Sequence, residues 1–401
     1  MKHLFYKKTL SFLALSSALS LYSCQQDDVL EQPVPAQSAV SDAKQTPGSK
    51  YIDGQYIVIF KGTGKSAVAL VSQLVLEKKI NAADIKDQIE GEIKGFSAVL
   101  TAKQVNLLRA LPFVQTIEQE QLISVDKPVN SFGLTAAGTE TTTNDSTITS
   151  EIIPDGVQLV GYGDGTGKTA WVIDSGIDVN NPELNVDVAR SKSFLTTTTS
   201  IQDGSGHGTM VAGIIAAKSN GSEIRGVAAN ATVVALRVMD DAGNGVVTNV
   251  IKAVNHVITN GKAGDVVNIS LASGISTTLD NAVKSAAGKG IFFSIAAGNS
   301  AVDCSNNSPQ RVNATNVYTV SAMDLNSYFW NSSNFGLPVD YAAPGVGILT
   351  LKVGGGTTTG SGTSFAAPHV AGLLLLKGNA ITNIGTVIGD KDAKPDPIAH
   401  L

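Results

Sequence analysis

The segment Gly362–Gly372 constrains the fold and chemistry of this chain more than any other part of the sequence. It places Ser364 at a turn of small residues, directly before an apolar, Ala-rich helix. A serine in such a position is most often a helix N-cap. A helix N-terminus also has free N–H groups and favours developing negative charge, so the same position suits a nucleophilic serine.

Two further segments supply the partners that a nucleophilic serine needs. Trp171–Gly176 begins as an apolar run, typical of a strand buried on both faces, and carries Asp174 at the end of that run. Gly206–Gly213 opens a predicted helix with His207 between two glycines. An imidazole with an unperturbed pKa of about 6.5 can act as base and then as acid near neutral pH. Asp, His and Ser therefore occur in the chain order of one known type of catalytic triad.

With Ala296–Asn299, these segments make the chain resemble the subtilisin-like serine proteases (subtilases), in particular their proteinase K branch. Four motifs occur in the family's order between about residues 152 and 377, and they overrule the N-cap alternative. The resemblance implies an α/β class catalytic domain, a three-layer α/β/α structure with a mainly parallel sheet. It also implies a monomeric serine endopeptidase that hydrolyses peptides or proteins through an acyl-enzyme intermediate, without a catalytic cofactor.

The resemblance assigns a role to each residue of the predicted catalytic site. Asp174 orients His207 and stabilises its imidazolium, His207 is the general base and then the general acid, and Ser364 is the nucleophile. The side-chain amide of Asn299 and the backbone N–H of Ser364 form the oxyanion hole.

The resemblance also predicts the substrate cleft. Asn268–Leu271 matches the segment that binds an extended peptide as an added strand. The family usually continues with two glycines in one wall of the main specificity pocket, whereas this chain has Ala272 and Ser273. Their side chains would take volume from the pocket, so we expect small or medium apolar P1 residues to be preferred. The predicted substrate-binding residues are Ser270, Leu271, Ala272, Ser273, Ala297 and Gly298.

Other positions near these motifs depart from the family pattern or match its calcium-binding positions. Met210 stands where the family usually has a second histidine, and Phe365 stands where a Met often follows the nucleophile. Asp340 matches a calcium-binding position of the proteinase K branch, and Glu183 and Asn220 fall where subtilisins hold another calcium. Such a calcium would be structural, and a merely solvated carboxylate is the alternative.

The N-terminus has the features of an export signal. Residues 1–23 combine a basic start with an apolar run that is too short for a mature membrane span of about 20 residues. They end in a segment that looks like a lipobox, so Cys24 is predicted to be lipidated; an ordinary signal peptide cut nearby is the alternative. Residues 24–50 are expected to form a flexible stalk. Within it, Gln25–Asp28 is either a solvated tether or an export tag resembling that of surface lipoproteins.

Residues 51–125 form a pattern of their own. The predicted order β-α-β-β-α-β is that of a small ferredoxin-like unit, and it resembles the inhibitor prodomain of subtilases. An unrelated α+β module is the alternative. The remaining predicted parts are a linker with the processing site (126–150), the peptidase domain (151–385) and a C-terminal tail (386–401). The expected product is an exported, self-processing zymogen. It is an outer-membrane lipoprotein precursor, periplasmic or on the cell surface, whose mature protease is released if the linker is cut.

Composition and motif order exclude other classes of function. The formal net charge of −5 and the lack of a basic run outside the N-terminus give no sign of nucleic-acid binding. With Cys24 in the anchor, Cys304 has no partner for an intramolecular disulfide and is expected to be structural. An α/β-hydrolase would need Gly-x-Ser-x-Gly, with its acid and His after the Ser. A non-catalytic lipoprotein on the same scaffold is disfavoured, because Asp174, His207, Asn299 and Ser364 are all present.

Overall fold

The computed structural model describes residues 51–62, 64–125 and 150–401. The predicted signal peptide, Cys24, the stalk and the linker up to residue 149 lie outside the described residues. Within the described ranges, no helix is both long enough and apolar enough to cross a membrane.

Residues 51–125 form an antiparallel sheet with strand order β4-β1-β3-β2, covered by two helices. The predicted order β-α-β-β-α-β is confirmed. Its core is a separate apolar cluster that includes Leu70, Leu74, Phe96 and Leu108. The elements are β1 (Tyr51–Phe60), α1 (Ala67–Leu76), a 3-10 turn (Ala82–Asp84), β2 (Ile85–Ile89), β3 (Gly95–Val99), α2 (Ala102–Arg109) and β4 (Val114–Ser124).

Local capping explains where the two helices of this unit begin. The Ser66 side chain accepts a hydrogen bond from the N–H of Ala69 and so caps α1. Thr101 and Gln104 form a capping box at the start of α2, in which each side chain accepts from the other's backbone N–H.

A long, mainly parallel sheet organises residues 150–401, so the predicted α/β class is confirmed. Its strand order is β18-β19-β15-β14-β13-β12-β6-β10-β7, with β8 also paired to β10. The strands are β6 (Thr169–Asp174), β7 (Asn185–Val186), β8 (Lys192–Ser193), β10 (Thr232–Arg237), β12 (Val266–Ile269), β13 (Phe292–Ala296), β14 (Val317–Met323), β15 (Val339–Pro344), β18 (Thr382–Thr386) and β19 (Pro397–His400).

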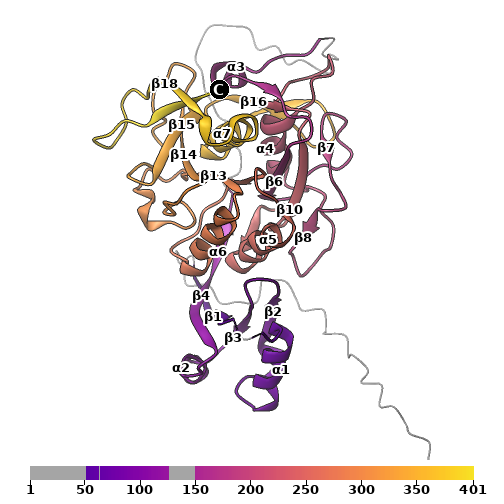
Figure 1. Cartoon of the computed structure of the whole chain (residues 1–401), viewed down its shortest axis with the longest axis vertical. Helices are drawn as coiled ribbons and strands as arrows, with labels where there is room; N and C mark the ends of the chain where they lie inside the picture. Colours follow the sequence, from indigo (N-terminus) through magenta and orange to yellow (C-terminus); the bar gives the residue numbers. More distant parts are fainter. Residues whose placement is uncertain (1–50, 63, 126–149) are drawn as a thin grey trace, which may run out of the picture. The chain divides into compact units, whose positions relative to one another are not determined.

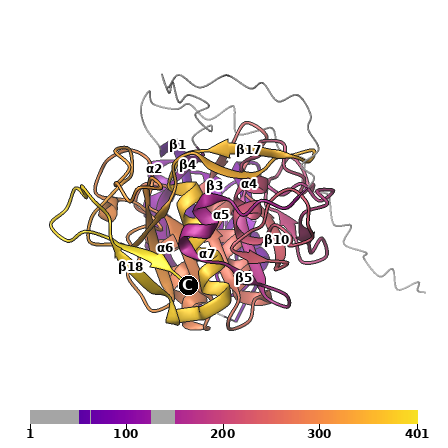
Figure 2. The same ribbon diagram turned by 90° about the horizontal axis from the view of Figure 1, so that it is seen from above.

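Helices cover both faces of this sheet (Figures 1 and 2). Buried residues of α4 and α7 belong to one apolar cluster, and those of α5 and α6 belong to a second. The result is the three-layer arrangement expected for the catalytic domain. The helices are α3 (Asp155–Val160), α4 (His207–Ala216), α5 (Val247–Asn260), α6 (Thr277–Gly288) and α7 (Thr363–Lys377). Shorter elements are β5 (Gly163–Asp164), β9 (Ala228–Ala229), β11 (Asn244–Val246), β16 (Ile348–Leu351), β17 (Thr357–Gly360) and 3-10 turns at Cys304–Asn306 and Gly378–Ala380.

The C-terminal segment differs from its prediction. Residues 386–401 were expected to be a tail, yet β19 pairs with β15 and continues the main sheet. Ile398 is buried there, and the N–H of Leu401 donates to the carbonyl of Val160. This segment is therefore part of the catalytic fold.

Strand β4 joins residues 51–125 to the catalytic unit. Its residues Leu122–Ser124 pair antiparallel with β11, so the sheet of residues 51–125 gains a fifth strand from the catalytic unit. Ile57, Ile59, Ile89 and Ile123 pack in the same apolar cluster as α5 and α6.

Candidate active site

Asp174 lies at the C-terminal end of β6, where open parallel sheets place their sites. All six residues of β6 are buried, and parallel neighbours β10 and β12 flank it. Asp174 itself is fully buried, and its Oδ1 accepts a hydrogen bond of 2.7 Å from the N–H of Ser175. The strand thus holds this carboxylate rigidly.

His207 is the first residue of α4, and it faces Asp174. Its Nδ1 lies 2.8 Å from Oδ1 and 3.0 Å from Oδ2 of Asp174, and the imidazole is only 2% exposed. The preceding residue, Gly206, has φ of 92°, a left-handed conformation that favours glycine. Because a carboxylate accepts from Nδ1–H, this arrangement leaves Nε2 as the basic nitrogen of a neutral ring.

Ser364 is the second residue of α7, which packs against α4. Its hydroxyl donates to the carbonyl of Ser270 over 3.3 Å, and the Ser270 hydroxyl donates back to the Ser364 carbonyl. The next residue, Phe365, sets its ring edge-on to the His207 ring at 5.7 Å between centroids. Asp174 and His207 are thus in direct contact, and the residue after Ser364 packs against the His207 ring.

Asn299 lies beside the start of α7. Its Oδ1 accepts hydrogen bonds from the backbone N–H of Thr363 (2.9 Å) and the Thr363 hydroxyl (2.8 Å). These bonds orient the side-chain amide, with Oδ1 turned toward Thr363. A Cβ on Gly362 would lie 3.2 Å from Nδ2, so the close approach favours glycine there.

Thr363 is a functional residue that the sequence analysis missed. Its hydroxyl donates to Asn299 and also accepts from the N–H of Gly298 at 2.9 Å. One hydroxyl therefore connects the nucleophile helix to the predicted oxyanion residue. The sequence signal was its place directly before Ser364.

The predicted substrate segment follows β12, and its residues differ in exposure. Leu271 and Ser273 are buried, and the Ser273 hydroxyl donates to the carbonyls of Gly274 and Ser308. Ala272 is partly exposed. Of the two residues that replace the family's glycines, Ala272 is therefore the more exposed one.

Gln310 joins the two predicted walls of the cleft, and no sequence motif pointed to it. Its side-chain amide donates to the carbonyls of Leu271 (2.9 Å) and Ala296 (2.8 Å). Ala296 immediately precedes Ala297 and Gly298. The buried Gln310 therefore fixes the spacing between the segments predicted to bind substrate.

Two further residues with reactive side chains, His369 and Cys304, are buried. His369 is fully buried, its Nδ1 contacts the carbonyl of Phe365, and burial lowers its pKa to about 4. Burial raises the pKa of the Cys304 thiol to about 12, with Asp303 adding to the effect. Neither group supplies a base or a thiolate near neutral pH, which is consistent with structural roles for both.

The predicted calcium ligands have different surroundings. Asn220 donates to Glu183 over 3.0 Å, and the pKa of Glu183 is raised by burial, with Glu223 and Glu151 adding to the effect. An oxygen of Glu223, Oε2, is buried without a hydrogen-bond partner. Asp340 accepts from the N–H of Thr319, and burial raises its pKa to about 6. Glu183 therefore lies near other acidic side chains, one of which has an unsatisfied oxygen, whereas Asp340 accepts from a backbone N–H.

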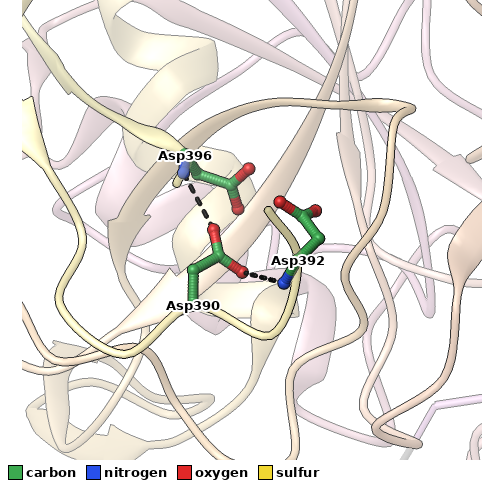
Figure 3. Close-up of side chains that lie close together, drawn as sticks. All are labelled: Asp390, Asp392 and Asp396. Atoms are coloured by element: carbon green, nitrogen blue, oxygen red, sulfur yellow. Dashed lines mark hydrogen bonds between the residues drawn. The ribbon is translucent and has the colours of Figure 1, made fainter. Parts of the chain in front are cut away.

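Figure 3 shows a further acidic group, formed by Asp390, Asp392 and Asp396 in the loop between β18 and β19. Their nearest carboxylate oxygens lie within 4.8 Å of one another. Asp390 accepts from the N–H of Asp396, Asp392 accepts from Gly336 and Lys394, and Asp396 accepts from the Ser321 hydroxyl. Because these bonds order the loop, the group is explained without a metal.

The fold is that of a serine peptidase, with an Asp at the end of a strand of the parallel sheet and a His at the start of a helix that packs on it. The subtilase family model matches residues 165–386, and the chain belongs to the subtilase family. The enzyme is a serine-type endopeptidase that acts on peptides or proteins.

Relatives support this assignment along most of the chain. Alkaline serine protease ver112 of Corniculantispora psalliotae is 31% identical over 360 residues, which cover 88% of each protein. Proteinase R of Parengyodontium album is 32% identical, over 80% of this chain and 78% of that protein. Among solved structures, a cold-adapted subtilisin-like serine proteinase has a TM-score of 0.55 at 32% identity. The match covers 61% of this chain and 97% of that structure.

Proposed function

We propose that this subtilase is an exported, self-processing zymogen that cleaves peptide bonds with the triad Asp174, His207 and Ser364. The observation that carries the proposal is the buried contact of 2.8 Å between His207 Nδ1 and Asp174. It orients the imidazole at the start of α4, next to the helix that bears Ser364. In the proposed reaction, His207 takes the Ser364 proton, and Nδ2 of Asn299 with the N–H of Ser364 binds the oxyanion.

A covalent probe tests the proposed nucleophile. A fluorophosphonate is added to the processed wild-type enzyme, and the labelled peptide is identified by mass spectrometry. We expect one label, on Ser364, together with loss of peptide hydrolysis. Labelling elsewhere, or hydrolysis that survives complete labelling of Ser364, would exclude this triad.

Residues 51–125 are proposed to be the inhibitor prodomain of this enzyme. Glu118 accepts from the N–H (2.9 Å) and hydroxyl of Thr278 at the start of α6. Glu120 accepts from the N–H (3.2 Å) and hydroxyl of Thr248 at the start of α5. Two acidic side chains of β4 thus supply hydrogen-bond acceptors to the starts of two helices of the enzyme.

The end of β4 supports an inhibitory role for residues 51–125, since we propose that substrates also bind along β11. Leu122, Ile123 and Ser124 pair with β11 as an added strand, which is how an extended peptide binds a sheet edge. We propose that the residues beyond Ser124 lead to the processing site, and that export and lipidation at Cys24 deliver the precursor to the outer membrane. Cleavage would then separate the mature enzyme from its anchor.

Glu120 makes the proposed inhibition depend on pH. It is fully buried, and burial raises its pKa from 4.5 to about 7, a shift that Asp87 increases and the Thr248 contacts oppose. The bound prodomain therefore holds this proton more tightly than the free prodomain does. Affinity is greatest below about pH 4.5 and falls as pH rises through about 7, on the order of 10²-fold. Gel filtration of the cleaved complex from pH 4 to 9 measures the fraction of prodomain retained.

Two variants identify the group responsible. Glu120→Gln should flatten this pH dependence, since its amide does not titrate. The control is Glu92→Gln, which removes a more exposed contact to Lys289. In this variant the affinity of the prodomain should still fall as the pH rises through about 7. Tighter binding of the wild-type prodomain at pH 8 than at pH 5 would contradict the role of Glu120.

We propose a preference for small or medium apolar P1 residues, carried by the partly exposed Ala272. A Cβ in the wall of a specificity pocket excludes the largest substrate side chains. One methylene more or less in such a pocket changes the discrimination between two substrates by about 1–3 kcal/mol. A peptide library should therefore show faster cleavage after Ala, Val or Leu than after Phe or Tyr. Ala272→Gly should shift the ratio toward Phe, whereas a wild-type enzyme that already prefers Phe would refute the proposal.

We also propose a structural calcium at the Glu183–Asn220 contact. At a calcium concentration about 100 times the Kd, binding adds about 2.7 kcal/mol to the free energy of unfolding. Chelation should therefore lower the Tm by roughly 5–10 °C. Glu183→Gln should abolish the effect of the chelator, measured by calorimetry. If the effect instead survives in Glu183→Gln and disappears in Asp340→Asn, the calcium binds at Asp340.

A further inference from the structure

Asp203 is a buried carboxylate that the proposed triad does not use. It lies in the loop before α4 and is 2% exposed. It accepts five hydrogen bonds from described residues. Its Oδ1 accepts from the Ser175 hydroxyl (2.8 Å) and the N–H groups of Ser205 (3.1 Å) and Gly206 (2.8 Å), and its Oδ2 accepts from the N–H (2.9 Å) and hydroxyl (2.7 Å) of Thr209.

These bonds connect the element that carries Asp174 to the element that carries His207. Ser175 donates its N–H to Asp174 and its hydroxyl to Asp203. The same hydroxyl accepts from the N–H of Gly208 at 3.0 Å, in the first turn of α4. Asp203 and Ser175 together therefore set the position of α4 against the end of β6.

Asp203 also lies at the positive end of α4. The first N–H groups of a helix have no partner within it, and Gly206 provides no side-chain cap. His207 begins this helix and is buried, so both the helix dipole and the loss of water disfavour an imidazolium there. A carboxylate bonded to Gly206 and Thr209, on either side of His207, offsets that cost.

The other charged groups around His207 do not replace this charge. Asp174 faces it from β6, while Arg237 is already paired with Asp241 next to Gly204. The carboxylate of Asp178 is bonded to Gln202 and to the N–H of Gly354. From α7 the neutral ring of Phe365 packs edge-on against the His207 ring.

We propose that Asp203 is a positioning residue of the triad. It holds the first turn of α4 against the end of β6, and its negative charge favours the imidazolium form of His207. This inference rests on the proposed function, and it assigns Asp203 no contact with substrate.

The test is Asp203→Asn in the full chain, measured on the processed enzyme. The amide places N–H groups against backbone N–H donors whichever way it turns, so the network is weakened and the charge is lost. We expect kcat for peptide hydrolysis to fall about tenfold or more while KM changes less than twofold. The acid limb of the kcat/KM profile should move to lower pH by about one unit, since the imidazolium loses its second carboxylate.

Two further variants separate positioning from general stability. Asp265→Asn changes another carboxylate that is 2% exposed and is bonded to Trp171, just before β12. It should lower the Tm and leave the pH profile unchanged. Ser175→Ala breaks the link to β6 but keeps the Asp203 charge, so kcat should fall several-fold with the acid limb in place.

The outcomes are distinct. An unchanged acid limb in Asp203→Asn, or the same shift in Asp265→Asn, would overturn the electrostatic part of the inference. If Asp203→Asn does not fold, Ser175→Ala decides the positioning part, which a wild-type kcat would contradict. Failure of the wild type itself to hydrolyse peptides or to be labelled at Ser364 would instead remove the proposed function.

Discussion

Replacing Ser364 with Ala is expected to abolish peptide hydrolysis and to leave the chain at full length. The proposed mechanism uses the hydroxyl of Ser364, and the other candidate nucleophiles, His369 and Cys304, are buried with pKa values far from neutral. Turnover should fall by about 10⁶, the loss known for the nucleophile of subtilisin, a member of this family. If the precursor cuts its own linker, the variant should accumulate uncut, as intact-mass analysis would show.

The matched control is Ser361→Ala, which changes a serine three residues earlier, outside α7. It should process and turn over normally. Ser364→Ala should also keep the wild-type fold by circular dichroism, since a methyl group replaces a partly exposed hydroxyl. Normal maturation of Ser364→Ala in a protease-deficient host would rule out self-cleavage, whereas residual hydrolysis near the wild-type rate would rule out Ser364 as nucleophile.

Replacing Asn299 with Leu should lower kcat by about 10²–10³ with little change in KM, as found for the equivalent donor in subtilisin. The expected loss is confined to the transition state, because an oxyanion forms only there. Leucine has a similar volume but cannot donate, and it also leaves Thr363 without its acceptor. Steady-state kinetics on one peptide ester and one peptide amide would measure both parameters.

Thr363→Val separates the two consequences of that change. It removes the hydroxyl that orients Asn299 and keeps the amide donor itself. We expect a smaller loss of kcat than in Asn299→Leu. An equal or larger loss in Thr363→Val would mean that orientation, and not donation by Nδ2, dominates. An unchanged kcat in Asn299→Leu would exclude Asn299 from the oxyanion hole.

Sequence motifs predicted the parts of the site that are contiguous in the chain. Asp174, His207, Asn299 and Ser364 each lie in a short segment whose local structure follows from its own residues. Their convergence depends on the fold, which the order of the motifs indicated through the family resemblance. The caps at the starts of α1 and α2 are also local features, since each capping side chain bonds to an N–H only three residues away.

Features that depend on contacts between distant segments were not predicted. Gln310 connects Leu271 with Ala296, and no pattern in the sequence links these positions. Ser273 was expected in the pocket wall, but its hydroxyl is turned toward Ser308, a direction that loop sequence does not specify. The segment 386–401 was rich in Asp and Lys and lacked a clear period, so an edge strand there was indistinguishable from a tail.

Two departures from the family pattern have a common spatial explanation. Met210 and Phe365 are far apart in the chain, yet both are buried in one small cluster with Ile214 and Ile348. The Phe365 ring also lies against His207. A flexible Met side chain can adapt to a neighbouring ring, so we interpret the two residues as a packing pair.

If substrates bind along the short strand β11 as Leu122–Ser124 do, this strand limits which proteins the enzyme can digest. It offers backbone groups over the three residues Asn244–Val246, and the segment that occupies them is fully extended. A chain that takes the same place must give up its own helix or sheet hydrogen bonds over that length. Native proteins would therefore be cut at sites that open by local unfolding, so their susceptibility would follow the opening free energy of the target as well as its amino-acid sequence.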